Sequence, residues 1–216
     1  MNDIILIIDE TEVKGRAGMT ILQAAEQEGI KIPTLCHASE LKPTGVCRIC
    51  LVEVEGVRTL MGACHTPIAE GIIVHTRSHK VLETRKAVVE LLLTAHTGSC
   101  VTDINAKECA LHKLASDLEV GPPRFQVREP RHFPAEDSNP YVQRDLSKCI
   151  LCRRCIGACN DIAQKHVLSI GYRGFQSKII VAFDGPLDKE VCRDCGICID
   201  YCPTGALSRG LSARKP

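Results

Sequence analysis

Several features common in other proteins are scarce in this sequence of 216 residues. Tryptophan is absent and aromatic residues make up 3% of the chain, so aromatic burial contributes little to its order. No stretch approaches the roughly 18 apolar residues of a membrane span, and we expect no membrane insertion. Basic and acidic residues nearly balance, at 27 and 26. The chain therefore lacks the electrostatic footprint of a nucleic-acid-binding protein.

Motifs that bind nucleotides or direct secretion are also missing. No G-x-G-x-x-G opens a helix and there is no Walker-type loop. The N-terminus has no basic region, and its apolar run Ile4–Ile8 is about half the length of a signal-peptide core and is closed by Asp9. We therefore expect a cytoplasmic protein, and we find no catalytic site of its own.

Cysteine, in contrast, is abundant, with 14 residues. An even number allows a disulfide framework, but such a framework requires a secreted protein. The N-terminus argues against secretion, so we expect the cysteines to bind metal.

Two runs near the C-terminus share the spacing C-x2-C-x2-C-x3-C. In such runs three thiolates surround one 4Fe-4S cluster and the fourth reaches the neighbouring cluster. Zinc sites prefer two C-x2-C pairs separated by a dozen or more residues, without a third evenly spaced thiolate. The spacing thus predicts two 4Fe-4S clusters, one on Cys149, Cys152, Cys155 and Cys202, the other on Cys192, Cys195, Cys198 and Cys159.

The first run departs from the usual pattern because Asn160 replaces the proline expected after its fourth cysteine. Proline there mainly fixes the local backbone, so ligation is not threatened. Three basic residues, Lys148, Arg153 and Arg154, crowd this run. They either favour the reduced cluster or form a solvated docking face, and the sequence leaves both open.

A second pattern, C-x10-C-x2-C-x13-C, lies nearer the N-terminus, with Gly45 just before its second cysteine. A 2Fe-2S centre on a plant-type fold takes most of its ligands from one long loop, and glycine lets that backbone close on the cluster. This pattern predicts a 2Fe-2S cluster on Cys36, Cys47, Cys50 and Cys64.

The expected elements around this loop are strands, one helix and further strands. Strands are predicted at residues 4–8, 12–16, 50–55 and 72–75. The helix begins at a Thr20–Gln23 capping box and ends at Gly29. Four further elements are expected after these strands. They are a long helix at about 79–95, a shorter helix through Leu111, Leu114 and Leu118, a proline-rich strap to Pro140, and a hairpin between the two C-terminal cysteine runs.

The segment at residues 45–56, GVCRICLVEVEG, resembles the 2Fe-2S domain of the large iron-sulfur subunit of respiratory complex I. It is equally similar to iron-only hydrogenases, NAD-linked formate dehydrogenases and the small diaphorase subunit of NAD-reducing hydrogenases. The resemblance covers residues 1–207 and implies a β-grasp fold for the first part. His37 and His65 lie too close to Cys36 and Cys64 for a Rieske site, so we expect neither to be a ligand.

In these proteins a helical segment follows, with a 4Fe-4S cluster on H-x3-C-x2-C-x5-C. Here the matching positions are His96, Cys100, Asp103 and Cys109, so an aspartate stands where the family has a cysteine. Carboxylate is a harder donor than thiolate. The site therefore either holds a third, differently tuned 4Fe-4S cluster or has lost its cluster.

The fold class expected is α+β in three parts: a 2Fe-2S ferredoxin domain at 1–78, a helical His-Cys segment with its strap at 79–140, and a double 4Fe-4S ferredoxin-like domain at 141–216. Because no catalytic domain follows the last repeat, we expect catalysis on another subunit. The resemblance implies an electron-transfer subunit between a flavin- and NAD(P)H-binding diaphorase subunit and a catalytic redox subunit. Alternatives are a free polyferredoxin and a cluster-based sensor or zinc-binding module.

Overall fold

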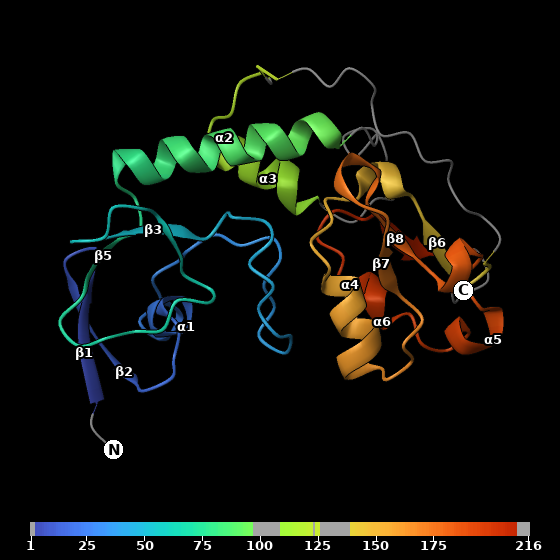
Figure 1. Ribbon diagram of the computed structural model, residues 1–216, viewed down its shortest axis with the longest axis horizontal. Helices are drawn as coiled ribbons and strands as arrows, with labels where there is room; N and C mark the ends of the chain where they lie inside the picture. Colours follow the sequence, from blue (N-terminus) through green and yellow to red (C-terminus); the bar gives the residue numbers. More distant parts are fainter. Residues whose placement is uncertain (1–2, 97–108, 123, 126–138, 211–216) are drawn as a thin grey trace. The chain divides into compact units, whose positions relative to one another are not determined.

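The structure is a computed structural model that describes residues 3–96, 109–122, 124–125 and 139–210. The chain divides into two compact units, which are treated separately. Unit 1 comprises the described parts of Met1–His37 and Pro43–Val89, and unit 2 those of Ala38–Lys42 and Glu90–Pro216 (Figure 1). The division into three parts at residues 78 and 140 stays a prediction.

Five strands form the sheet of unit 1, in the order β2-β1-β5-β3-β4. They are β1 (Asp3–Ile8), β2 (Thr11–Arg16), β3 (Leu51–Val54), β4 (Met61–Gly62) and β5 (Ile73–His75). Strand β1 pairs antiparallel with β2 and parallel with β5, and β3 pairs antiparallel with β5 and β4. The first and last strands of the unit thus lie side by side, and this arrangement is the predicted β-grasp ferredoxin fold.

The first hairpin is buried on one face only. Leu6 and Ile8 are inaccessible to solvent, whereas Ile5 and Ile7 between them are each 38% exposed. An antiparallel ribbon at a sheet edge commonly has one solvated face, so an unbroken apolar run in β1 need not be buried on both faces. Asp9 and Glu10 join β1 to β2 with positive φ angles of 46° and 69°, the backbone of a tight hairpin turn that matches the strand twist.

Helix α1 (Ile21–Gln27) begins and ends where the sequence predicts. The Thr20 side chain accepts from the Gln23 backbone N–H, and the Gln23 side chain accepts from the Thr20 N–H, which completes the capping box. Gly29 follows the helix with a φ of 72°, a left-handed conformation that glycine adopts without strain. The buried residues of α1 complete the core of unit 1 with β1, β2 and β3.

Helix α2 (His79–Ala95) has the predicted bounds, and its apolar residues differ in burial. Val81 and Val89 are inaccessible to solvent, whereas Leu91 is 52% exposed. Between the two valines on the same face lies Arg85, which is 3% exposed. A buried arginine in this position was not expected from the sequence.

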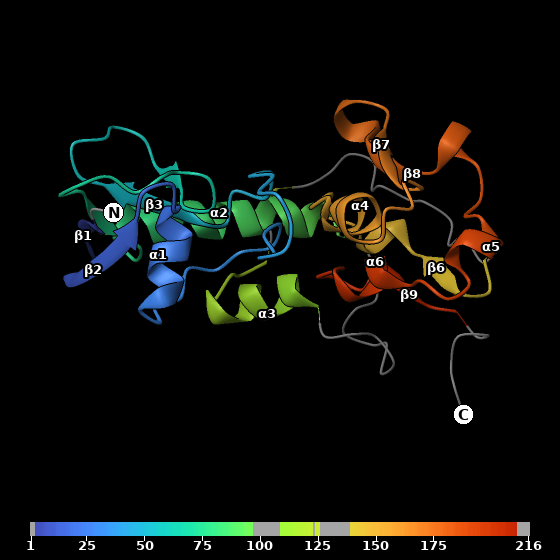
Figure 2. The ribbon, with the colours of Figure 1, turned by 90° about the horizontal axis from the view of Figure 1, so that it is seen from below.

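Unit 2 is built from short elements held by a small core. They are α3 (Ala110–Asp117), β6 (Val142–Arg144), η1 (Leu146–Lys148), α4 (Arg154–Gly157), the π-helix η2 (Ala158–Ile162), β7 (Ser169–Gly171), η3 (Gly174–Gln176), β8 (Lys178–Ile180), η4 (Ala182–Asp184), α5 (Lys189–Cys192), α6 (Ile197–Asp200) and β9 (Leu207–Arg209). Strands β6 and β9 pair antiparallel and lie side by side in Figures 1 and 2. Strands β7 and β8 pair antiparallel and form the predicted hairpin between the cysteine runs.

Asn139 ties the backbone at the start of β6 to the loop before the second cysteine run. Its Oδ1 accepts from the backbone N–H groups of Tyr141 and Val142, at 2.9 and 3.0 Å, and its Nδ2 donates to the carbonyl of Leu187 at 3.3 Å. The side chain is 1% exposed. These hydrogen bonds hold the backbone at the start of β6 against the loop before α5.

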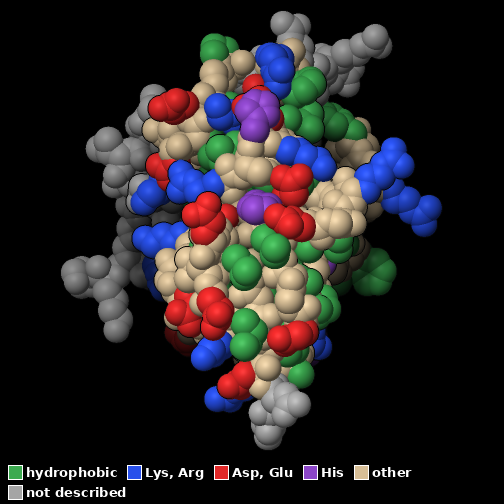
Figure 3. Space-filling view, turned by 90° about the vertical axis from the view of Figure 1, so that its left-hand side faces the viewer, with side chains coloured by type: hydrophobic (Ala, Val, Ile, Leu, Met, Phe, Trp, Pro, Cys, Tyr) green, Lys and Arg blue, Asp and Glu red, His purple; other side chains and the backbone are tan. Residues whose placement is uncertain are grey.

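The surface shown in Figure 3 carries acidic and basic side chains interspersed, in line with the near-neutral net charge. Across the described ranges, every helix is too short or too polar to span a membrane.

Candidate metal centres

Unit 1 brings together the four cysteines predicted for the 2Fe-2S cluster. All four are buried, and they come from the long loop between α1 and β3 and from the turn after β4. Their thiols interact in two pairs, Cys36 with Cys47 and Cys50 with Cys64, and the Cys36 thiol also acts electrostatically on the second pair. None of the 13 described cysteines forms a disulfide.

The pKa values within each pair are pushed in opposite directions. The hydrogen bond from the Cys47 thiol lowers the pKa of Cys36 to about 5, and the same bond raises the pKa of Cys47. Likewise the Cys64 thiol lowers the pKa of Cys50 to about 7, while that of Cys64 is raised by the shared bond. Two pairs of buried, mutually interacting thiols fit a cluster of two irons in which each iron takes two thiolates.

The loop around these thiols is shaped by Gly45 and His65. Gly45 has a φ of 65°, and a Cβ added there would lie 2.8 Å from Cδ2 of the His65 ring. His65 is exposed, and its Nε2 lies 3.2 Å from Nη1 of Arg48. The ring therefore packs on the outside of the loop, against the backbone at Gly45 and Gly62. The expectation that His37 and His65 are not ligands stays a prediction.

Arg85 fixes the part of the loop that leads into β3. Its Nε donates to the carbonyl of Ile49 at 2.9 Å, and its Nη2 donates to the carbonyl of Leu51 at 2.9 Å. Burial lowers the pKa of Arg85, and the neighbouring Cys50 opposes that shift. A buried guanidinium thus positions both residues that flank Cys50. The sequence did not predict this role of Arg85, because the residue lies among the apolar residues on the buried face of α2.

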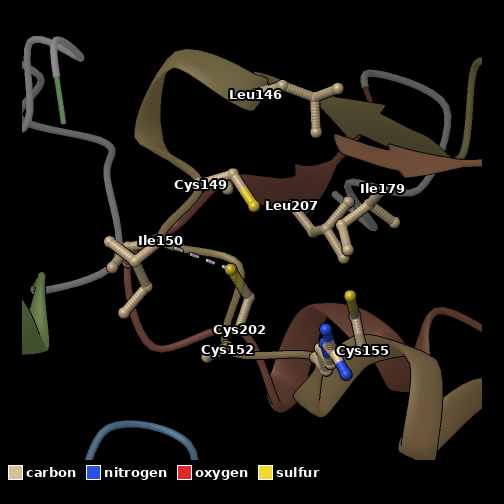
Figure 4. A pocket seen from close by; sticks show the side chains of 11 residues that line it. Leu146, Cys149, Ile150, Cys152, Cys155, Ile179, Cys202 and Leu207 are labelled. Carbon is tan, nitrogen blue, oxygen red and sulfur yellow. Dashed lines mark hydrogen bonds between the residues drawn. The ribbon is translucent and has the colours of Figure 1, made fainter. Parts of the chain in front are cut away.

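In unit 2, the sulfurs of one predicted 4Fe-4S set share a cavity. Cys149, Cys155 and Cys202 point into it from three segments, and Cys152 lines it as well (Figure 4). The remaining wall is mostly apolar and includes Leu146, Ile179 and Leu207. A cavity with four thiols and a mostly apolar wall suits a cluster whose irons take only sulfur ligands.

The second set gathers around the fourth cysteine of the first run. The thiols of Cys159 and Cys195 both act on Cys192, and those of Cys159, Cys192 and Cys195 act most strongly on Cys198. In the first set the strongest thiol neighbours of Cys152 are Cys149 and Cys202. The fourth cysteine of each run therefore lies near the first three of the other run, the arrangement that crossed ligation requires.

Burial raises the pKa of the innermost thiols, to about 12 for Cys152 and Cys198 and well above the usual value for Cys155. For Cys152, a hydrogen bond from the backbone N–H of Arg154 opposes this rise in pKa. Two other sulfurs also accept backbone N–H groups: Leu151 donates to Cys149 and Val167 to Cys159, both at 3.4 Å. Because these thiols are protonated without iron and must lose their protons to bind it, the affinity of the sites for iron depends on pH. Donors to the sulfurs also stabilise the more negative, reduced state of a cluster.

Two of the four residues predicted for the third 4Fe-4S site, Cys100 and Asp103, lie outside the described residues. The other two meet: Nε2 of His96 lies 3.6 Å from the Cys109 sulfur. A residue that was not predicted, His112, brings a ring nitrogen to the same place. The short spacing Cys109-x2-His112 is a metal-ligand spacing that could have indicated it.

Family models match two segments of the chain. Residues 2–79 match a 2Fe-2S iron-sulfur cluster binding domain, and residues 139–208 match the ferredoxin-like domain of NADH-quinone oxidoreductase subunit 3.

Curated relatives match over nearly the whole chain. It is 38% identical, over 96% of its length, to the NADP-reducing hydrogenase subunit HndD of Solidesulfovibrio fructosivorans. It is 36% identical, over 93%, to an NADH-quinone oxidoreductase subunit of Rhizobium meliloti, and 36% identical, over 94%, to the alpha subunit of the NADPH-Fe(3+) oxidoreductase of Geobacter sulfurreducens. The matched region is 36%, 23% and 24% of the length of these relatives.

A solved structure shares the fold. It is a crystal structure of an NAD+-reducing NiFe hydrogenase in the H2-reduced state, with a TM-score of 0.83 and 27% sequence identity. The match covers 99% of this chain and 90% of that one. Together with the two family models, these matches confirm the resemblance: the chain contains a 2Fe-2S ferredoxin domain and a 4Fe-4S ferredoxin-like domain, and it belongs to the iron-sulfur region that complex I shares with NAD(P)-linked hydrogenases.

Proposed function

We propose that the chain is an electron-relay subunit of a cytoplasmic NAD(P)H-linked oxidoreductase complex. In this proposal it passes electrons between a flavin- and NAD(P)H-binding diaphorase subunit and a catalytic redox subunit such as a hydrogenase or formate dehydrogenase. The relatives support this proposal, because their names describe oxidoreductases that pair a nicotinamide nucleotide with different redox partners: a hydrogenase reaction, a quinone or Fe(3+).

The relay consists of one 2Fe-2S cluster and two 4Fe-4S clusters. The 2Fe-2S ligands are Cys36, Cys47, Cys50 and Cys64. The 4Fe-4S ligands are Cys149, Cys152, Cys155 and Cys202 for one cluster, and Cys192, Cys195, Cys198 and Cys159 for the other. The observation that carries the proposal is the presence of three separate groups of four thiols. A chain with several redox centres can conduct electrons, and no substrate-binding site is evident among the described residues. The relay does not depend on a third cluster at the His96 site.

A reduction experiment tests the proposal. In the chain alone, purified anaerobically with its clusters, NADH and NADPH should leave the clusters oxidised, because the chain has no nucleotide motif. With the flavin-containing subunit of the native complex added, one of the two nucleotides should reduce them, as followed by EPR. Clusters that stay oxidised in the reconstituted complex would contradict the relay.

A free polyferredoxin is the second candidate, favoured by the compact double-cluster unit. Gel filtration of native cell extract separates the two, since a diffusible carrier elutes alone near its mass of 23.6 kDa. Elution there, with no larger form, would favour the free carrier over the subunit.

A further inference from the structure

Three metal-binding side chains of unit 2 converge outside the cysteine sets of the proposed relay. His96 directly follows α2, Cys109 is the residue before α3, and His112 lies in the first turn of α3. One donor atom from each lies within 4.8 Å of the other two. His96 and Cys109 are each 7% exposed, and the Cys109 thiol makes no capping hydrogen bond to the helix. The group is thus a mostly buried set of two imidazoles and one thiol.

A backbone carbonyl orients His96 for ligation. Nδ1 of His96 lies 2.9 Å from the carbonyl oxygen of Lys148. Because a carbonyl only accepts, Nδ1 carries the proton and the lone pair is on Nε2, the atom that faces Cys109. Histidines that bind metals in proteins almost always donate their other N–H to such an acceptor. This contact is a second observation, independent of the clustering, that points to a metal.

The separation of the donors indicates a single ion. Two donors on one tetrahedral Zn2+, with Zn–S at about 2.3 Å and Zn–N at about 2.05 Å, lie about 3.6 Å apart. The observed Nε2–Sγ distance is 3.6 Å. In a 4Fe-4S cube each ligand binds a different iron at a different corner, which places the ligand atoms much farther apart. The described residues therefore fit one ion better than a cube.

We propose that Nε2 of His96, the Cys109 thiolate and a ring nitrogen of His112 bind one Zn2+ ion in place of a third 4Fe-4S cluster. Two imidazoles and one thiolate form a donor set that zinc takes readily, with a fourth position left for water or another donor. Since Zn2+ has no redox chemistry, the ion does not take part in the relay.

The site braces the first 4Fe-4S loop. His96 holds the carbonyl of Lys148, the residue before Cys149, and the N–H of Ala110, the residue after Cys109, donates to the carbonyl of Pro203 at 2.8 Å. Pro203 follows Cys202 in the sequence. One ion would therefore fix both segments that supply Cys149 and Cys202.

The test uses the full chain, purified anaerobically and loaded with iron to about ten atoms, the content of one 2Fe-2S and two 4Fe-4S clusters. We expect one zinc per chain, whose zinc-edge X-ray absorption shows one sulfur at about 2.3 Å and nitrogen or oxygen at about 2.0–2.1 Å. His112→Ala should weaken zinc binding, measured by chelator competition, at least about 100-fold. His79→Ala, at an exposed histidine, is the matched control and should bind zinc as the wild type does.

A gain-of-signal variant guards against misfolding of His112→Ala. His112→Cys should keep the zinc and change its shell from one sulfur to two, whereas an unchanged one-sulfur shell would overturn the assignment of His112. Two further outcomes would also overturn the proposal. One is four additional irons that His112→Ala does not remove, which is a cube. The other is a wild-type chain with no zinc, or with zinc bound by four sulfurs. In that case the His96–Cys109 contact is only a hydrogen bond.

Discussion

Arg153 and Gly196 occupy the same position in the two cysteine runs and have the same left-handed backbone, with φ 64° in both. Each directly follows the second cysteine of its run and directly precedes a short helix, α4 or α6. At Arg153 this turn lets the N–H of Arg154 donate to the sulfur of Cys152. The repeat seen in the sequence is therefore a repeat of backbone conformation, and only one of its copies uses the residue that adopts this conformation without strain.

Replacing Gly196 should cost stability through the backbone alone. A Cβ at Gly196 would meet only the ends of Arg209 and Ile199, at 3.6 and 3.7 Å, so there is room for it. The left-handed conformation then accounts for the expected loss, about 1–2 kcal/mol in the free energy of unfolding for Gly196→Ala. Chemical denaturation of the iron-loaded chain measures it. Gly196→Asn, which tolerates this conformation better, should lose less, and equal losses for both would argue against backbone strain.

Replacing Arg153 should change the potential of the nearby cluster. Arg153 lines the cavity of Cys149, Cys152, Cys155 and Cys202, so its positive charge favours the reduced, more negative cluster. Arg153→Asn removes the charge and keeps a residue suited to φ 64°, and it should lower the potential by on the order of tens of millivolts. Arg153→Lys is the charge-keeping control. If an EPR-monitored redox titration gives the same potential for all three, the arginine belongs to the alternative role of a docking face.

Arg85 should be worth more to stability than any surface charge on α2. Arg85→Met leaves the carbonyls of Ile49 and Leu51 buried without their donor, which should cost about 3 kcal/mol. Lys86→Met, one residue on, removes the same charge from a partly exposed position and should cost less than about 0.5 kcal/mol. Thermal unfolding of unit 1, followed by loss of the 2Fe-2S absorbance, compares them. Similar melting temperatures for the two variants would refute the positioning role of Arg85.

Local signals in the sequence predicted the elements well wherever a short stretch of residues determines them. The capping box at Thr20, Gly29 after the helix, and the 17-residue apolar pattern of α2 each specify a structure through neighbours in the chain. The cysteine spacings predicted the two domain types for the same reason, because a cluster imposes its own geometry on a short loop.

What the sequence could not provide are partners far apart in the chain. Arg85 meets carbonyls 34 and 36 residues away, and His96 meets one 52 residues away. Nothing local to these residues marks such contacts. Strand β4, with two residues, is likewise too short to leave a periodic pattern. His112 is an intermediate case. Its spacing from Cys109 can be read from the sequence, but this spacing indicates a metal site only once the fold places His96 next to both residues.

The crossed ligation can be tested by iron analysis of paired variants. If Cys159 and Cys192 share a cluster, the double variant Cys159→Ala/Cys192→Ala should damage one 4Fe-4S centre and keep about six of the ten irons. The double variant Cys159→Ala/Cys152→Ala should damage both centres and keep fewer. The reverse order of iron contents would show that each run binds its own cluster with all four cysteines.

Removing iron should unfold unit 2 while much of unit 1 stays folded. The core of unit 2 includes Cys155, Cys159 and Cys202, and its strands are only three residues long, so few contacts remain without the clusters. Metal binding and folding are one equilibrium in such domains. Unit 1 has six-residue strands β1 and β2, paired along their full length, over an apolar core.

Hydrogen exchange measures amide protection in both units at once, in the full chain from which iron has been removed anaerobically by a chelator. The amides of Asp145 and Gly210, which donate to Ala206 and Tyr141 across the β6–β9 ladder, should lose their protection. The paired amides of β1 and β2 are the internal control and should keep most of theirs, because their hydrogen bonds and the packing of Leu6 and Val13 do not involve iron. Protection that persists at Asp145 and Gly210 in iron-free protein would mean that the small apolar core of unit 2 folds without its clusters.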